Sequence, residues 1–126
     1  MSAAKIVAGF GFRASATVDS LRSAYDIAAA DHTVTALATS YDKAQATCLT
    51  LLADALALPI HPIGAGAIAG AQTITQSPRI QRERSTGSLA EATALAAAGP
   101  GARLISSRHI SQDRRATCAI AIGEKT

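Results

Sequence analysis

The stretch "IVAGFGFRASAT", residues 6–17, decides how this chain is interpreted, because it leads from an apolar run into a helix start. Its Ile, Val and Phe residues predict a buried strand from Lys5 to Phe12. Thr17 can cap the helix that follows, since its hydroxyl accepts an N–H of the first turn and Asp19 suits the positive helix end. Apolar residues continue at helical spacing to residue 29. The stretch therefore predicts a strand followed by a helix.

The glycines of this stretch raise the question of a nucleotide site. Gly9, Gly11 and Ala14 spell G-x-G-x-x-A, which is similar to a dinucleotide-binding fingerprint. That fingerprint also needs an acid about 20 residues on, at the end of the second strand. Asp31 comes before the second predicted strand, and Asp42 comes too late for the usual spacing. The spacing argues against a nicotinamide site.

Two interpretations of the glycine stretch remain open. Backbone N–H groups at the end of a strand can converge on an anion, and Arg13 adds donors that match a carboxylate or phosphate. The alternative is a tight connection between strand and helix, with Arg13 simply exposed to solvent. The residues alone do not choose between them.

A second strand is predicted over residues 34–39 and a second helix over residues 44–58. Thr39 and Lys43 bracket the end of this strand, which lies beside the glycine stretch if the two strands are parallel. Lys43 would face the positive end of the second helix, where a cation is unfavourable, and such a placement hints at function. The alternative is a solvated lysine.

The rest of the chain continues the alternation of strands and helices. Serine and glutamate in "SLAE", residues 88–91, are typical of a capping box, and "GPG", residues 99–101, of a helix end. Further predictions are strands at 60–63, 103–106 and 116–122, a turn or short helix at 64–70 and a loop at 72–87. The last strand is small or apolar on both faces, which indicates an interior strand. We expect one α/β domain over residues 1–126, a layered α/β/α fold with a mixed, largely parallel sheet.

Composition narrows the class of protein. The 126 residues are 48% hydrophobic and 17% charged, which is typical of a globular domain. The first residues lack the apolar core of a secretory signal, no apolar stretch is long enough to span a membrane, and two cysteines make no disulfide framework. We expect a cytoplasmic protein without a membrane partner.

Cys48 is expected to be buried on the second helix. The three histidines show no metal-ligand spacing, so no metal site is expected.

The positive charge lies in the second half of the chain. Residues 1–71 carry a net charge of −1 and residues 72–126 a net charge of +4, which indicates an anionic partner. Few aromatic residues are available to stack bases, and no nucleic-acid motif accompanies the cations, so nucleic acid is not expected. The cations assigned to two polar connections are Arg79, Arg82, Arg84, Arg108, Arg114 and Arg115.

The ordered set of motifs resembles the CobE proteins of cobalamin (vitamin B12) biosynthesis, which are similar to the C-terminal domain of CbiG. The matching segments are "VAGFGFR" (7–13), "LATSYDK" (37–43), "TQSPRI" (75–80), "TGSLAEATALAAAG" (86–99) and "TCAIAI" (117–122). The resemblance implies an α/β domain of the corrin ring pathway, whose intermediates carry several acidic arms. It implies a tetrapyrrole ligand of the precorrin type, and other enzymes of the pathway as further partners. No cofactor is expected.

Departures from the family pattern limit what can be transferred. The family often has a cysteine where this chain has Phe12, and an acidic pair where this chain has Gln45 and Ala46. CbiG opens a lactone on the macrocycle and releases acetaldehyde, but it has N-terminal domains without counterpart here. We therefore expect a binding or auxiliary role; hydrolysis of the lactone and docking on another enzyme remain the alternatives. The ligand-binding residues expected are Gly9, Gly11, Arg13, Thr39, Lys43, Ser77, Arg79, Gly87, Ser88 and Glu91.

Overall fold

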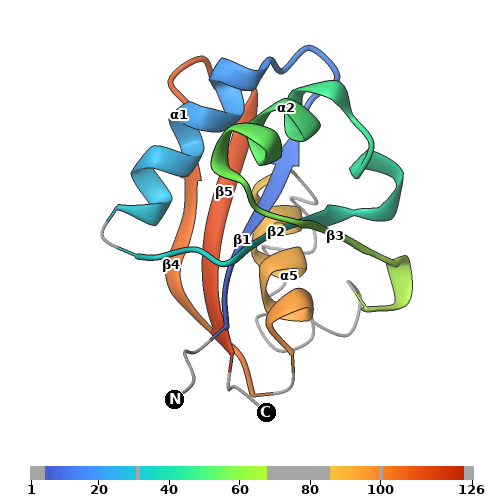
Figure 1. Ribbon diagram of the computed structural model, residues 1–126, viewed down its shortest axis with the longest axis vertical. Coiled ribbons are helices and arrows are strands. Elements are labelled where there is room, and N and C mark those ends of the chain that lie inside the picture. The colour runs from blue at the N-terminus through green and yellow to red at the C-terminus, as the bar shows by residue number, and fades with distance from the viewer. Residues whose placement is uncertain (1–4, 31, 68–85, 100, 124–126) are drawn as a thin grey trace.

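The computed structural model describes residues 5–30, 32–67, 86–99 and 101–123, with only the backbone course for residues 86–88. Five strands in this part of the chain form one sheet in the order β3-β2-β1-β5-β4 (Figure 1). Three of them pair in parallel: β1 (Lys5–Phe12), β2 (Ala36–Ser40) and β3 (Ile60–Ile63). Strands β5 (Ala116–Gly123) and β4 (Arg103–Ile110) extend the sheet antiparallel from β1. The predicted mixed sheet is confirmed.

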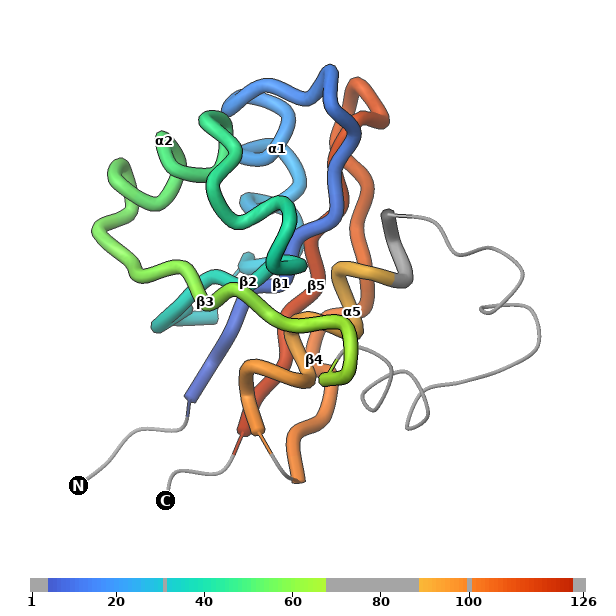
Figure 2. The backbone as a smooth tube through the Cα atoms, turned by 90° about the vertical axis from the view of Figure 1, so that its right-hand side faces the viewer, coloured from blue at the N-terminus to red at the C-terminus, as the bar shows by residue number. Residues whose placement is uncertain are grey.

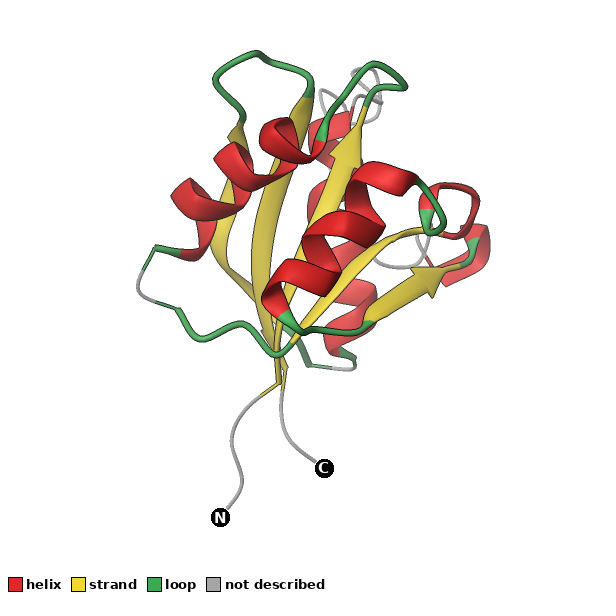
Figure 3. Cartoon of the chain, turned by 45° about the horizontal axis from the view of Figure 1, so that its top comes forward, coloured by secondary structure: helices red, strands yellow, loops and turns green. Residues whose placement is uncertain are grey.

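Helices cover both faces of the sheet. α1 (Val18–Ala29) and α2 (Thr47–Leu56) lie on one face, and α5 (Thr86–Ala98) lies on the other (Figure 2). Figure 3 shows α1 and α2 side by side across the strands, consistent with the contacts between these two helices. The predicted α/β/α layering is therefore correct.

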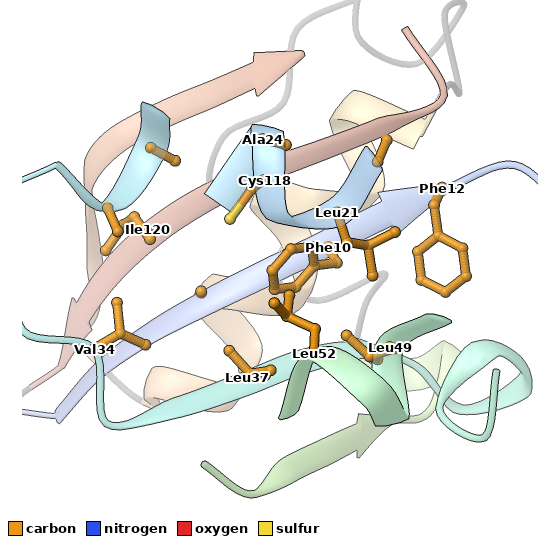
Figure 4. Close-up of a cluster of buried hydrophobic side chains, with 14 of the residues drawn as sticks. Phe10, Phe12, Leu21, Ala24, Val34, Leu37, Leu49, Leu52, Cys118 and Ile120 are labelled. Atoms are coloured by element: carbon orange, nitrogen blue, oxygen red, sulfur yellow. The ribbon is translucent and has the colours of Figure 1, made fainter. Parts of the chain in front are cut away.

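The larger core lies between the sheet and the pair α1 and α2. Phe10 from the central strand packs with Leu21, Leu49 and Leu52, all completely buried (Figure 4). Helix α1 begins where predicted, because the Thr17 hydroxyl accepts the Ser20 N–H and the Ser20 hydroxyl accepts the Thr17 N–H. Burying this aliphatic and aromatic surface is the main force that holds the two helices on the sheet.

The core on the α5 face is built by close approach of backbones. Alanines of α5 pack on Val7, Ala38 and Ala121 of the sheet. A Cβ added to Gly9 would come within 2.6 Å of the Ala94 nitrogen, and closer still to the carbonyl oxygen of Ala90. The absence of a side chain at Gly9 is therefore what lets the helix lie against β1.

The second helix and the helix after the predicted loop begin elsewhere than expected. A short 3-10 helix, η1 (Tyr41–Lys43), follows β2, and α2 starts only at Thr47. α5 begins at Thr86, so the backbone of Ser88 is already helical. Ser88 therefore does not occupy the N-cap position predicted for it. The predicted loop at 72–87 otherwise lies outside the described residues. Gly99 adopts a φ of 98°, the left-handed conformation expected for the residue after the helix.

Two smaller expectations also need correction. β4 continues to Ile110 rather than ending at residue 106, so Arg108 lies in a strand and not in a polar connection. Cys48 is only partly buried, because α2 turns Leu49, Leu52 and Ala53 toward the core instead. The interior position of β5, between β1 and β4, agrees with its predicted burial on both faces.

Candidate functional site

The candidate site lies at the edge of the sheet where β1, β2 and β3 end. Because these strands are parallel, their carboxyl ends meet at one edge. α5 runs opposite to β1: its residue Ala90 lies over Gly9, and Ala98 lies over Gly123, which pairs with Lys5. The amino-terminal end of α5 therefore points toward the same edge. This edge of an open α/β sheet is the usual place for a ligand.

Lys43 ties the end of β2 to the end of β1. Its ammonium group donates a hydrogen bond of 2.9 Å to the carbonyl oxygen of Phe12, and it lies 5.1 Å from the centre of the Phe12 ring. Lys43 is the last residue of η1, and α2 begins only at Thr47. The prediction that Lys43 stands at the positive end of the second helix is therefore wrong. The charge is instead fixed at the last residue of β1 by a carbonyl and an aromatic face.

Two arginines have their backbones next to the contact between Lys43 and Phe12. Arg13 directly follows Phe12, and its N–H donates a 3.0 Å hydrogen bond to the carbonyl of Arg115, in the turn between β4 and β5. Both arginines are exposed. Three cationic residues thus come together around the end of the central strand. We call Arg13, Lys43 and Arg115 the cationic edge.

A hydrogen-bonded carboxylate fixes the turn that carries Arg115. Asp113 accepts hydrogen bonds from the hydroxyls of Ser111, at 2.6 Å, and Ser20, at 2.5 Å, and from the Arg115 N–H at 3.1 Å. The Ser111 and Ser20 hydroxyls, with the backbone and charge of Arg115, lower the pKa of Asp113 to about 2. Through Ser20, which also belongs to the cap of α1, this carboxylate joins the turn to the helix.

An exposed tyrosine stands beside the cationic edge. Tyr41 is 73% exposed and lies in η1, two residues before Lys43. It borders a groove of about 440 Å³ together with Gln45, Ile60 and Pro62. It also borders a pocket of about 350 Å³ with Ser40, Ile63, Gly64 and Ala65, and Asp42 lines both hollows. A planar ligand could stack on this ring while its acidic arms reach the cations.

Three of the predicted site residues have structural roles inside the sheet. Gly9 is paired on both sides, with Ala38 and Ala119, and lies under α5, so it forms no anion-binding turn. Gly11 also lies inside β1, where its carbonyl oxygen accepts a hydrogen bond from the Thr117 hydroxyl. The hydroxyl of the fully buried Thr39 donates a hydrogen bond to the Phe10 carbonyl oxygen, and this bond ties β2 to β1. Arg13 and Lys43 are the predicted residues that the structure brings together.

Of the remaining predicted residues, Glu91 has a described contact, and this contact lies away from the cluster. Glu91 accepts a hydrogen bond of 3.2 Å from the Arg108 N–H, so it joins α5 to β4 at the far side of the sheet instead of capping its own helix. Gly87 and Ser88 lie in the first turn of α5, where the structure gives only the backbone course. Ser77 and Arg79 lie outside the described residues.

Residues 5–30, 32–67, 86–99 and 101–123 contain no group of three or more His, Cys, Asp or Glu side chains that could hold a metal ion. In the same part of the chain, no helix has the length and apolar character needed to cross a membrane.

Comparison with known proteins identifies the family. Residues 6–121 match the family described as "Cobalamin synthesis G C-terminus". The chain belongs to this family. No curated protein matches the chain significantly. The resemblance to cobalamin biosynthesis proteins that the motifs indicated is therefore correct, and it extends over nearly the whole sequence.

Solved structures of cobalamin biosynthesis proteins share the fold. CobE, a protein from the cobalamin biosynthetic pathway, is 28% identical with a TM-score of 0.79, over 96% of this chain and 92% of CobE. The cobalamin biosynthesis protein chiG from Agrobacterium tumefaciens is 33% identical with a TM-score of 0.75, over 95% and 99% of the two chains. A putative cobalamin biosynthesis protein G homolog from Sulfolobus solfataricus is 20% identical with a TM-score of 0.72. This match covers 98% of the present chain and 38% of the Sulfolobus chain, and at 20% identity it shows the fold alone.

Ser40, Tyr41 and Arg115 lie at the site but are not among the ligand-binding residues predicted from the sequence. Ser40 and Tyr41 stand inside the motif "LATSYDK" between the two residues that were selected. Arg115 was treated as one of several loop cations. Pairing of β4 and β5 as a hairpin beside β1 would have placed it next to Arg13, and an antiparallel register is the signal that was not available.

Proposed function

We propose that this member of a cobalamin biosynthesis family binds an acidic tetrapyrrole intermediate at the carboxyl edge of β1, β2 and β3. The observation that carries the proposal is the Lys43 ammonium fixed on the Phe12 carbonyl, directly before Arg13. A hydrogen bond from Arg13 to Arg115 brings the third cation alongside. Because the Lys43 ammonium is already held by a backbone carbonyl, it can bind a carboxylate with little further loss of side-chain conformational entropy.

The shape beside these cations supports a planar ligand. Tyr41 presents an exposed ring between two hollows, and Pro62 and Ile60 add apolar surface to the larger one. In this arrangement the macrocycle packs against the tyrosine, and its carboxylate arms reach toward Lys43 and Arg13. Of the ligand-binding residues expected from the sequence, Ser77, Arg79, Gly87 and Ser88 remain candidates for further contacts.

An absorbance titration with a corrin that has free carboxyl arms, cobyrinic acid, tests the proposal. We expect binding at micromolar to tens of micromolar concentration, and much weaker binding of the fully methyl-esterified corrin, which lacks the charges. Because exposed charges are screened by salt, the affinity for the free acid should also fall as ionic strength rises. Equal affinity for acid and ester would contradict the proposal.

Matched variants identify the cations. Lys43→Met keeps an apolar stem over the Phe12 ring but removes the ammonium, and Arg13→Ala removes the guanidinium. Each should weaken binding about fivefold, the loss of roughly 1 kcal/mol expected for one exposed ion pair. Lys5→Met is the control, because Lys5 is exposed at the opposite end of β1. If the control weakens binding as much as Lys43→Met, only overall charge matters.

Two other incubations test the alternative roles, one with a lactone-bearing intermediate and one with other enzymes of the pathway. Release of acetaldehyde from a lactone-bearing intermediate would support a hydrolase instead of a binding protein. Stable association with another enzyme of the pathway without the small molecule would support a docking module.

A further inference from the structure

The ladder between β1 and β5 continues for one position beyond the two strands, and that position brings two arginines opposite each other. Phe12 pairs with Ala116, so the next pair is Arg13 with Arg115, and the Arg13 N–H donates a 3.0 Å hydrogen bond to the Arg115 carbonyl oxygen. Like charges directly opposite each other in an antiparallel pair are destabilising. Two cations therefore occupy a pair of positions that stability alone disfavours, which is typical of a functional site.

The register assigns this pair to the face of the sheet that α5 covers. Gly9 of β1 lies against Ala90 of α5, whereas Phe12 packs in the core on the opposite face. Because residues alternate between the two faces along a strand, Arg13 and its partner Arg115 fall on the same face as Gly9. Both arginines are exposed, so a ligand at the carboxyl edge of the sheet can reach them.

Asp113 replaces Arg13 in one hydrogen bond of this pair. In a complete pair each residue donates its N–H to the carbonyl oxygen of the other. The Arg115 N–H instead donates to the Asp113 carboxylate and to the Ser111 hydroxyl, each at 3.1 Å. The other carboxylate oxygen of Asp113 accepts a hydrogen bond from the Ser20 hydroxyl of α1. The carboxylate therefore fixes the backbone of Arg115 relative to both the turn and the helix.

A carboxylate is the group that two opposed arginines fit. Its two oxygens can accept hydrogen bonds from both guanidinium groups, and its charge removes the repulsion between them. Asp113 does not fill this role, because its oxygens already accept hydrogen bonds from two hydroxyls and a backbone N–H. The group between the arginines must therefore come from a ligand.

We propose that Arg13 and Arg115 form a clamp for one carboxylate group, and that Asp113 is the positioning residue that holds Arg115 in this clamp. The inference rests on the proposed function for the nature of the ligand, and it assigns one acidic arm to a defined pair of side chains. The Lys43 ammonium, fixed on Phe12, is then left for a different arm.

NMR of the arginine side chains tests the clamp. ¹⁵N-labelled protein is titrated at low salt with cobyrinic acid and, separately, with tricarballylate, a tricarboxylate that has no macrocycle. We expect both ligands to shift the Nε–H signals of Arg13 and Arg115 together and to leave that of Arg22, exposed on α1, unchanged. Binding of cobyrinic acid without these shifts overturns the clamp and leaves the proposed function standing. Shifts with tricarballylate but no binding of cobyrinic acid support the clamp and refute the tetrapyrrole ligand, and no response to either overturns both.

Two variants of equal charge test the role of Asp113. Asp113→Asn and Asp113→Ala both remove the negative charge, but only Asn keeps an oxygen that can accept the Arg115 N–H. We expect Asp113→Ala to bind tricarballylate about fivefold more weakly than Asp113→Asn, as for one hydrogen bond. In an Arg115→Gln background this difference should disappear, which a merely structural effect would not produce. Equal affinities of the two variants, or a difference that persists without Arg115, overturn the assignment of Asp113.

Arg114 provides the matched control for Arg115. It is the neighbouring residue, exposed and of the same charge, but it does not stand opposite Arg13 in the ladder. Arg115→Gln should weaken tricarballylate binding about fivefold, and Arg114→Gln less than about twofold. Equal losses would mean that only the overall positive charge attracts the ligand, and would overturn the clamp.

Discussion

Gly9→Ala tests the packing of α5 on the central strand. An added Cβ would lie 2.6 Å from the Ala94 nitrogen, and closer to the Ala90 carbonyl oxygen. Ordinary contact begins near 3.4 Å, so the Ala94 backbone would have to retreat about 0.8 Å, and a helix backbone cannot yield as a flexible side chain does. We expect a loss of about 3 kcal/mol in the free energy of unfolding, at the upper end of overpacking costs.

Thermal and urea unfolding followed by circular dichroism measure this loss. For a chain of this size the melting temperature should fall by about 10 °C. Gly66→Ala is the matched control, because an added Cβ at Gly66 meets nothing within 4 Å; its stability should change by less than about 0.5 kcal/mol. Adding Ala94→Gly to Gly9→Ala should give no rescue, since the backbone atoms stay in place. A Gly9→Ala variant as stable as the wild type would refute close packing as the reason for this glycine.

Three further predictions concern other parts of the fold. Asp113, whose pKa is lowered to about 2 from an ordinary 3.8, stabilises the native state above about pH 4, and this contribution is lost as pH falls toward 2; Asp113→Asn should therefore melt lower at neutral pH and show a shallower loss on acidification, and equal pH profiles would contradict this. Burial raises the pKa of both thiols, and it does so most strongly for Cys118, which is fully buried, whereas Cys48 is only partly buried; alkylation followed by mass spectrometry should modify Cys48 first and Cys118 only on unfolding, and equal rates would contradict the burial. Thr39→Val removes the hydrogen bond to the Phe10 carbonyl and should cost about 1 kcal/mol in urea unfolding; no loss would mean that this bond does not hold β2 to β1.

Local signals in the sequence predicted much of the fold. The strand at residues 5–12, the cap at Thr17 and the glycine after α5 each depend on neighbouring residues, so their physics is visible in the sequence. Errors arose where tertiary contacts decide. "SLAE" has the pattern of a capping box, but the Glu91 carboxylate pairs with the Arg108 N–H of a strand that lies 17 residues further along the chain.

The candidate site was predictable only in part, for the same reason. Lys43 and Arg13 were found because both follow parallel strands, whose ends must meet at one edge. Gly9 was misassigned because the same absence of a side chain serves an anion-binding turn or a closely packed helix, and only the position of α5 distinguishes the two. The Ser40 hydroxyl is buried without a hydrogen-bond partner in the described part of the chain; this depends on what surrounds it, and no sequence pattern reveals that.

The most direct test of the proposed function is to locate a bound corrin on the protein. Cobyrinic acid is added to ¹⁵N-labelled protein, and the backbone amides that shift or broaden are mapped by NMR. We predict that the largest changes fall on Arg13, residues 40–45 and Arg115, and that Lys43→Met reduces them. Changes confined to β4 and the outer surface of α1, or no change at saturating ligand, would contradict a tetrapyrrole site at the cationic edge.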